Sequence, residues 1–90
     1  MSRRAEWRKV LDSEVERWSA LSCVRLVSEL RDLQAYEVEF DSKNYQVEVQ
    51  LLEDNEHYLH FMVAVDDGGL PASIAPVSRS VIRQKALPET

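Results

Sequence analysis

The stretch YEVEFDSKNYQVEVQL, residues 36–51, decides the fold of this chain. On both sides of its centre, bulky apolar residues alternate with polar ones, which is the period of a strand with one buried face. The polar run at 41–44 separates the two alternating halves and is typical of a tight turn. The stretch is therefore predicted to form an antiparallel hairpin.

The register of this hairpin follows from where its tip lies. With residues 42–43 at the tip, Phe40 faces Tyr45 and every apolar residue of the two strands falls on one face. The same register sets Glu37 against Glu48, a mildly unfavourable pair of like charges. A shift by two residues keeps the same faces, so the alternation predicts the faces more firmly than the turn.

A third strand is expected from about His57 or Tyr58 to Asp66, because alternation continues there after a second polar turn. Pairing Leu51 with Leu59 brings its apolar residues onto the same face as those of the hairpin. That coincidence predicts an antiparallel meander.

The chain beyond the third strand is harder to interpret. Gly68 and Gly69 allow the positive φ of a sharp reversal. Residues 73–85 fit either a fourth strand or a short helix, and we expect a bulged edge strand, since Pro76 cannot donate to a sheet ladder. Residues 86–90 are predicted to form a disordered tail.

Two helices are expected before the strands. Between Arg3 and Ser19 the apolar residues fall on one arc of a helix, with no Gly or Pro to interrupt it. If that helix continued, charged residues would enter the buried stripe, so the helix must end near Ser19. Ser22 then fits as the N-cap of a second helix whose apolar face runs to Leu33.

Glu14 interrupts the stripe of the first helix. We expect it to lie at the margin of the buried stripe with its carboxylate in water, because Glu is almost never buried without a partner. The alternative is a paired, partly buried carboxylate, which would be a candidate site. Cys23 is expected to be a small buried hydrophobe rather than a nucleophile.

The predicted architecture is α+β: two N-terminal helices packed on one face of a three- or four-stranded antiparallel meander, in a single domain of residues 1–85. The expected core is Trp7, Leu11, Val15, Trp18, Leu26, Leu30, Val38, Phe40, Val47, Val49, Phe61, Val63 and Val65.

Composition and charge exclude some classes of function and favour others. The chain has 90 residues and a net charge of −5, with a strongly acidic body and two mildly basic ends. An acidic body disfavours nucleic acid and favours a basic protein partner. The longest apolar run, residues 61–65, is far shorter than the roughly 20 residues of a membrane span. No apolar region follows the basic residues 1–6, so they are not expected to act as a secretory signal. A single cysteine suits a reducing compartment, so a cytoplasmic location is expected.

Sequence motifs for chemistry are missing. There is no Gly-rich phosphate loop and no nucleophile elbow. His57 and His60 are three apart on a strand, hence on opposite faces, and cannot chelate one ion together. We therefore expect no enzyme activity, no metal and no cofactor. The alternative class is a small-ligand binder or enzyme with a cleft between the helices and the sheet.

The favoured hypothesis is a small interaction or regulatory module that binds a basic protein through the uncovered sheet face. Tyr and Met are common at binding surfaces, and an acidic rim steers basic partners. The protein is expected to be a monomer or a weak homodimer. The binding residues are predicted to be a central row of Tyr58, His60 and Met62 with a rim of Glu37, Glu39 and Glu48.

Overall fold

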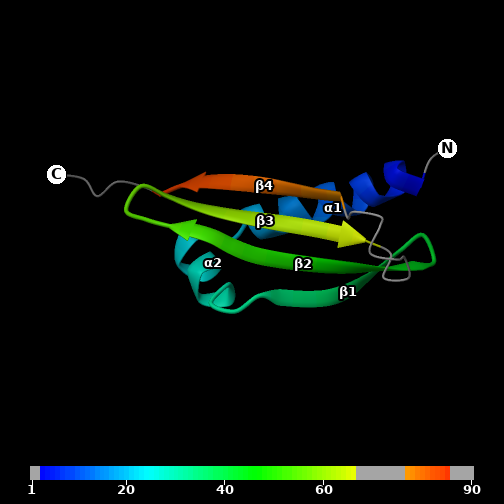
Figure 1. Ribbon diagram of the computed structural model, residues 1–90, viewed down its shortest axis with the longest axis horizontal. Helices are drawn as coiled ribbons and strands as arrows, with labels where there is room; N and C mark the ends of the chain where they lie inside the picture. Colours follow the sequence, from blue (N-terminus) through cyan, green and yellow to red (C-terminus); the bar gives the residue numbers. More distant parts are fainter. Residues whose placement is uncertain (1–2, 67–76, 86–90) are drawn as a thin grey trace.

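A computed structural model of the protein describes residues 3–66 and 77–85 (Figure 1). These residues form α1 (Arg3–Ser19), α2 (Cys23–Glu29), β1 (Gln34–Phe40), β2 (Lys43–Asp54), β3 (Tyr58–Asp66) and β4 (Val77–Gln84). The strands make one antiparallel sheet in the order β1-β2-β3-β4, and both helices lie behind it in Figure 1. The predicted α+β architecture is confirmed.

Helix α1 buries the stripe that its sequence predicts. Trp7, Val10, Leu11 and Trp18 are buried, and Val15 is half-buried at the margin. At 3.6 residues per turn these positions share one side of the helix, so packing against the sheet removes them from water together. The helix lies behind β3 and β4, off the centre of the sheet (Figure 1).

Helix α2 is shorter than predicted. The side chain of Ser22 accepts a hydrogen bond from the amide of Arg25 at 3.1 Å, which confirms the expected N-cap. The helix ends at Glu29, however, and Leu33 is exposed. Gln34 at the start of β1 donates through Nε2 to the carbonyl of Glu29 at 2.9 Å. That bond satisfies a carbonyl left open where the helix stops.

The hairpin of β1 and β2 is paired two residues away from the predicted register. Phe40 lies opposite Lys43, so Asp41 and Ser42 form a two-residue turn and the predicted tip at 42–43 was wrong. Both turn residues have positive φ, 54° and 66°. This is the backbone of a type I′ turn, whose twist matches that of the flanking strands. The faces are as predicted, because a two-residue shift preserves them.

The observed register also separates two acidic residues. Glu37 lies opposite Gln46 instead of Glu48. Gln46 donates through Nε2 to Glu37 Oε2 at 3.4 Å. An attractive cross-strand pair therefore replaces the like-charge pair of the predicted register.

Strand β3 covers the predicted residues, but its pairing with β2 is shifted as well. Leu51 lies opposite Phe61 rather than Leu59. The turn before β3 is organised by Asn55, whose Oδ1 accepts from the amides of His57 at 2.8 Å and Tyr58 at 3.0 Å. These side-chain bonds hold the chain at the turn and set where β3 begins.

A bulge in β2 then moves the pairing of β2 with β3 by one further residue. The ladder changes register between Leu51 and Glu53, so Leu52 is the extra residue, and it is exposed. After the bulge Glu53 lies opposite His60. Bulges re-aim side chains, and this one brings an acidic residue beside β3.

Strand β4 confirms the edge strand that the sequence favoured over a helix at 73–85. It pairs with β3 in one uninterrupted register over Val77–Gln84, so the expected bulge was wrong for this range. Pro76, the glycine turn at 67–69 and the predicted tail at 86–90 lie outside the described residues.

The core lies between the helices and the sheet, and most of the predicted members are buried there. Three predicted members, Val15, Val38 and Phe40, are only half-buried, the last two because β1 is an edge strand. Three further residues, Val10, Tyr45 and Leu59, are buried as well.

Candidate functional site

The face of the sheet opposite the helices is the candidate site, and we name it the open face. It faces the reader in Figure 1. Strand residues that alternate with the core residues form it. They are Ala35, Glu37, Glu39, Asn44, Gln46, Glu48, Gln50, Glu53, Tyr58, His60, Met62, Ala64, Asp66, Ser78, Ser80, Ile82 and Gln84.

The predicted row on β3 lies along the middle of the open face. Tyr58, His60 and Met62 are all half-buried, since they pack among the side chains of the neighbouring strands. Ile82 of β4 lies opposite His60 and is 61% exposed, which adds an apolar residue that sequence reasoning did not assign to the site. The hydroxyl of Tyr58 donates to Glu53 Oε1 at 3.1 Å. The row therefore has an imidazole in the middle, with the apolar Ile82 beside it, and a hydrogen-bonded hydroxyl at the Tyr58 end.

The predicted acidic residues lie on one side of this row instead of around it. Glu37 and Glu39 are on β1 and Glu48 is on β2, and all three are exposed. Glu53 supplies a further carboxylate beside Tyr58. Without the bulge, alternation from Leu51 would turn Glu53 toward the core; the bulge at Leu52 brings it to the open face, opposite His60.

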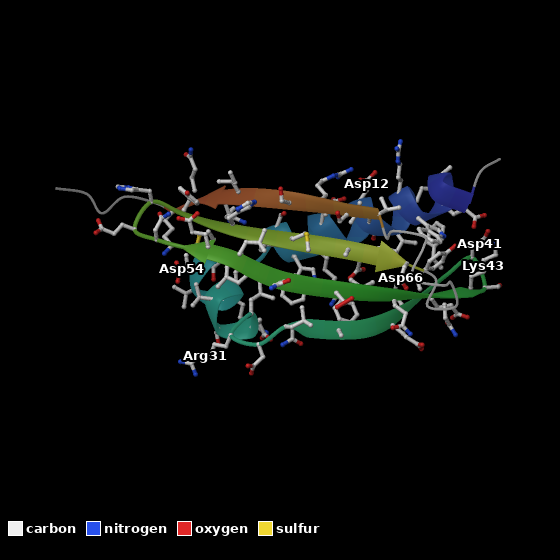
Figure 2. All side chains as sticks on the ribbon, in the orientation of Figure 1. Asp12, Arg31, Asp41, Lys43, Asp54 and Asp66 are labelled. Carbon is white, nitrogen blue, oxygen red and sulfur yellow. The ribbon has the colours of Figure 1, made fainter. Side chains whose placement is uncertain are left out.

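The basic side chains of the strands lie on the opposite, helix-facing side. Lys43 Nζ is 3.1 Å from Glu6 Oε2, and Arg79 Nη2 is 2.6 Å from Asp12 Oδ1 (Figure 2 labels Lys43 and Asp12). Arg83 Nη1 donates to the carbonyl of Ser19, the last residue of α1, and to the carbonyl of Leu21 just beyond it. A cation at a helix C-terminus is favourable because carbonyl groups are left open there.

Charge is thus sorted between the two sides of the sheet. Among the strand residues that the structure describes, no Lys or Arg lies on the open face, while four Glu do. Sequence reasoning missed this separation. Arg79 and Arg83 alternate in step with Val77 and Val81, which was the available signal that they share the helix-facing side.

Lys43, on the helix-facing side of the sheet, changes the pKa of Glu6 in α1. Glu6 Oε2 accepts hydrogen bonds from Lys43 Nζ and from the Tyr45 hydroxyl, both at 3.1 Å. The bond from Lys43 is the main cause that holds the pKa of Glu6 below its ordinary value. Burial is the main cause that raises the pKa of Tyr45.

Glu14 is buried, at 6% exposure, so the expectation of a carboxylate reaching water was wrong. The hydroxyl of Tyr36 donates to Glu14 Oε1 at 2.5 Å, and Trp18 Nε1 donates to the same hydroxyl at 2.7 Å. The guanidinium of Arg17 lies 5.4 Å from the centre of the Tyr36 ring. Burial first, and then the bond to Glu14, raise the pKa of Tyr36 to about 12.

This chain of hydrogen bonds ties α1 to β1 and gives the buried carboxylate the partner that burial requires. Each of the three polar groups is engaged with another side chain of the protein. The Tyr36 hydroxyl, whose pKa is raised, keeps its proton at neutral pH and donates it in the hydrogen bond to Glu14.

The apolar core fills the space between α1 and the sheet. Two hollows lie beside α2, and the first is formed between α2 and the end of β4. The first, of about 520 Å³, is lined by Cys23, Val24 and Val27 of α2 and by residues 83–85. The second, of about 220 Å³, lies outside Trp18, beside Arg17 and Arg25. No group of three metal-ligating side chains occurs in the described part of the chain.

No protein-family model matches this chain, and no match is found among curated proteins or solved structures. Within residues 3–66 and 77–85, neither helix is long and apolar enough to cross a membrane.

Proposed function

We propose that this protein is a small interaction module, without enzyme activity of its own, that binds a basic protein through the open face. The observation that carries the proposal is the sorting of charge, with Glu on the open face and the strands' Lys and Arg on the helix side. Potentials that complement each other across an interface raise association rates and exclude wrong partners.

The row on β3 supplies the short-range part of this recognition. Tyr58, Met62 and Ile82 offer apolar area beside the acidic residues of β1 and β2. Tyrosine is enriched among residues that dominate binding energy, and Met adapts its shape to a partner. The acidic residues attract the partner, and burial of the apolar row then slows its dissociation.

The same charges argue against nucleic acid as the partner, since carboxylates repel phosphates. The cysteine in the described residues, Cys23, is a free thiol. We accordingly propose a reducing compartment, such as the cytoplasm, for the encounter.

The test of the acidic residues uses two variants with the same change of net charge. Glu37→Gln with Glu48→Gln removes two charges from the open face, whereas Glu16→Gln with Asp32→Asn removes two exposed charges elsewhere. Binding of a short Lys-rich peptide is measured by calorimetry at low salt. We expect the open-face pair to weaken binding about fivefold or more and the control pair less than about twofold.

Equal losses of affinity in the two double variants would show that only net charge attracts the peptide, and the proposal would be wrong.

A folded variant with Tyr58→Ala and Met62→Ala tests the row on β3. It should raise the dissociation rate and leave the association rate nearly unchanged. Unchanged dissociation would exclude the row from the interface.

A further inference from the structure

Strand β1 is an edge of the sheet, and the turn next to it decides which of its backbone groups are free to pair. In a two-residue hairpin the residues that flank the turn, here Phe40 and Lys43, form a hydrogen-bonded pair. Such pairs alternate with non-hydrogen-bonded pairs along an antiparallel ladder. Ala35, Glu37 and Glu39 are therefore the β1 residues whose N–H and C=O groups point away from β2.

The two sides of this edge differ in chemistry. Glu37 and Glu39 are exposed on the open face, and Glu39 forms no ion pair or side-chain hydrogen bond with the residues that the structure describes. On the helix-facing side, Tyr36, Val38 and Phe40 are half-buried.

That incomplete burial has a cause in the arrangement of layers. The backbone of helix α1 lies behind β3 and β4 (Figure 1), and α1 reaches Tyr36 of β1 only through the side chains of Glu14 and Trp18. On β2 the neighbour Val47 is fully buried, because β1 covers it on one side and β3 on the other. The apolar row of β1 lacks such a neighbour on its outer side. A further strand there would cover it.

We propose that a basic partner adds an extended segment to the edge of β1, as a fifth strand in which Lys or Arg alternates with apolar residues. The basic residues would lie opposite Glu37 and Glu39 on the open face. The apolar residues would lie beside Tyr36 and Val38 on the helix-facing side. Backbone hydrogen bonds to Ala35, Glu37 and Glu39 give affinity, and the alternating side chains give specificity. This inference depends on the proposed function and names the form that its partner takes.

A second copy of this chain fits the edge poorly. Antiparallel pairing over the whole length of two β1 strands sets Glu37 against Glu37, and like charges directly opposite are destabilising. Strand β4, the other edge, carries neutral residues on the open face, and its arginines are engaged with α1. A basic segment therefore has its complement at β1.

The test compares two synthetic peptides of identical composition. In one, Lys and Val alternate; in the other, the Lys residues form one block and the Val residues a second. Net charge attracts both equally, but only the alternating peptide matches the edge. We expect it to bind about tenfold more tightly than the block peptide.

A substitution at Ala35 separates edge pairing from charge. Ala35→Pro removes an outward N–H that makes no bond to β2, and proline is tolerated on edge strands in such positions. Ala35→Val is the matched control, because it retains the N–H and favours a strand. Ala35→Pro should abolish the advantage of the alternating peptide, and Ala35→Val should retain it.

Amide hydrogen exchange of the unaltered chain gives a readout that does not depend on the proline variant. The amides of Ala35, Glu37 and Glu39 should slow about tenfold or more when the alternating peptide saturates the protein. If both peptides bind alike and these amides are unaffected, the edge inference is wrong and the proposed function stands. If neither peptide binds, the proposed function itself fails.

Discussion

Replacing Tyr36 with Phe removes a single oxygen atom from the junction between α1 and β1. That oxygen accepts a hydrogen bond from Trp18 Nε1 at 2.7 Å and donates one to Glu14 Oε1 at 2.5 Å. Trp18 and Glu14 are each 6% exposed, so water cannot readily take the place of the hydroxyl. The substitution should therefore leave two buried polar groups without their partner.

The expected cost follows from these two bonds. A neutral hydrogen bond contributes about 1 kcal/mol, and one to a charged group about 1.5–3 kcal/mol. Arg17 Nη1, 3.8 Å from Glu14 Oε1, stays near the carboxylate and offsets part of the loss. We expect Tyr36→Phe to lower the free energy of unfolding by about 2–3 kcal/mol. This is a large part of the roughly 5–10 kcal/mol typical of a chain of this length.

Urea unfolding measures this loss as a lower midpoint at an unchanged slope. The matched control is Tyr58→Phe, which removes a hydroxyl bonded to Glu53 at the surface. It should cost less than about 0.5 kcal/mol, as surface substitutions usually do. If Tyr36→Phe costs no more than Tyr58→Phe, the network does not hold α1 on the sheet and the reasoning from burial is refuted.

Further predictions concern pH, the core, the turn and the end of α1. Because the folded protein raises the pKa of Tyr36 to about 12 from 10.0, this group stabilises the fold fully below pH 10 and less as pH rises toward 12; urea midpoints across this range should fall less in Tyr36→Phe. Trp18→Ala should cost about 3–5 kcal/mol, and a loss below about 1 kcal/mol in denaturant melts would contradict its burial. Ser42→Gly should raise the free energy of unfolding, measured with urea, by about 1 kcal/mol, because glycine adopts the positive φ of the turn without strain. Ser42→Val should lower this free energy. Arg83→Met should cost about 1–2 kcal/mol and speed amide exchange at the end of α1, where carbonyls lose their donor; unchanged exchange there would argue against that contact.

The sequence alone determined the elements and their faces. Alternation in residues 36–51 predicted the hairpin, and the stripe from Trp7 to Trp18 predicted the side of α1 that is buried. These patterns depend only on the spacing of apolar residues two to four positions apart, so they can be recognised in the sequence without knowledge of the tertiary structure. The placement of Tyr58, His60 and Met62 on the uncovered face followed from the same rule.

Only the tertiary structure decided the register of the strands and the hydrogen-bond partners of the buried side chains. The two-residue shift of the hairpin came from the backbone of Asp41 and Ser42, which alternation does not encode because it preserves the faces. The bulge at Leu52 moved Glu53 to the open face, and Glu14 became buried because Tyr36, 22 residues away, supplies a hydroxyl. A carboxylate's place depends on which groups the fold brings within bonding distance, and residues far apart in sequence meet only when the whole chain is packed.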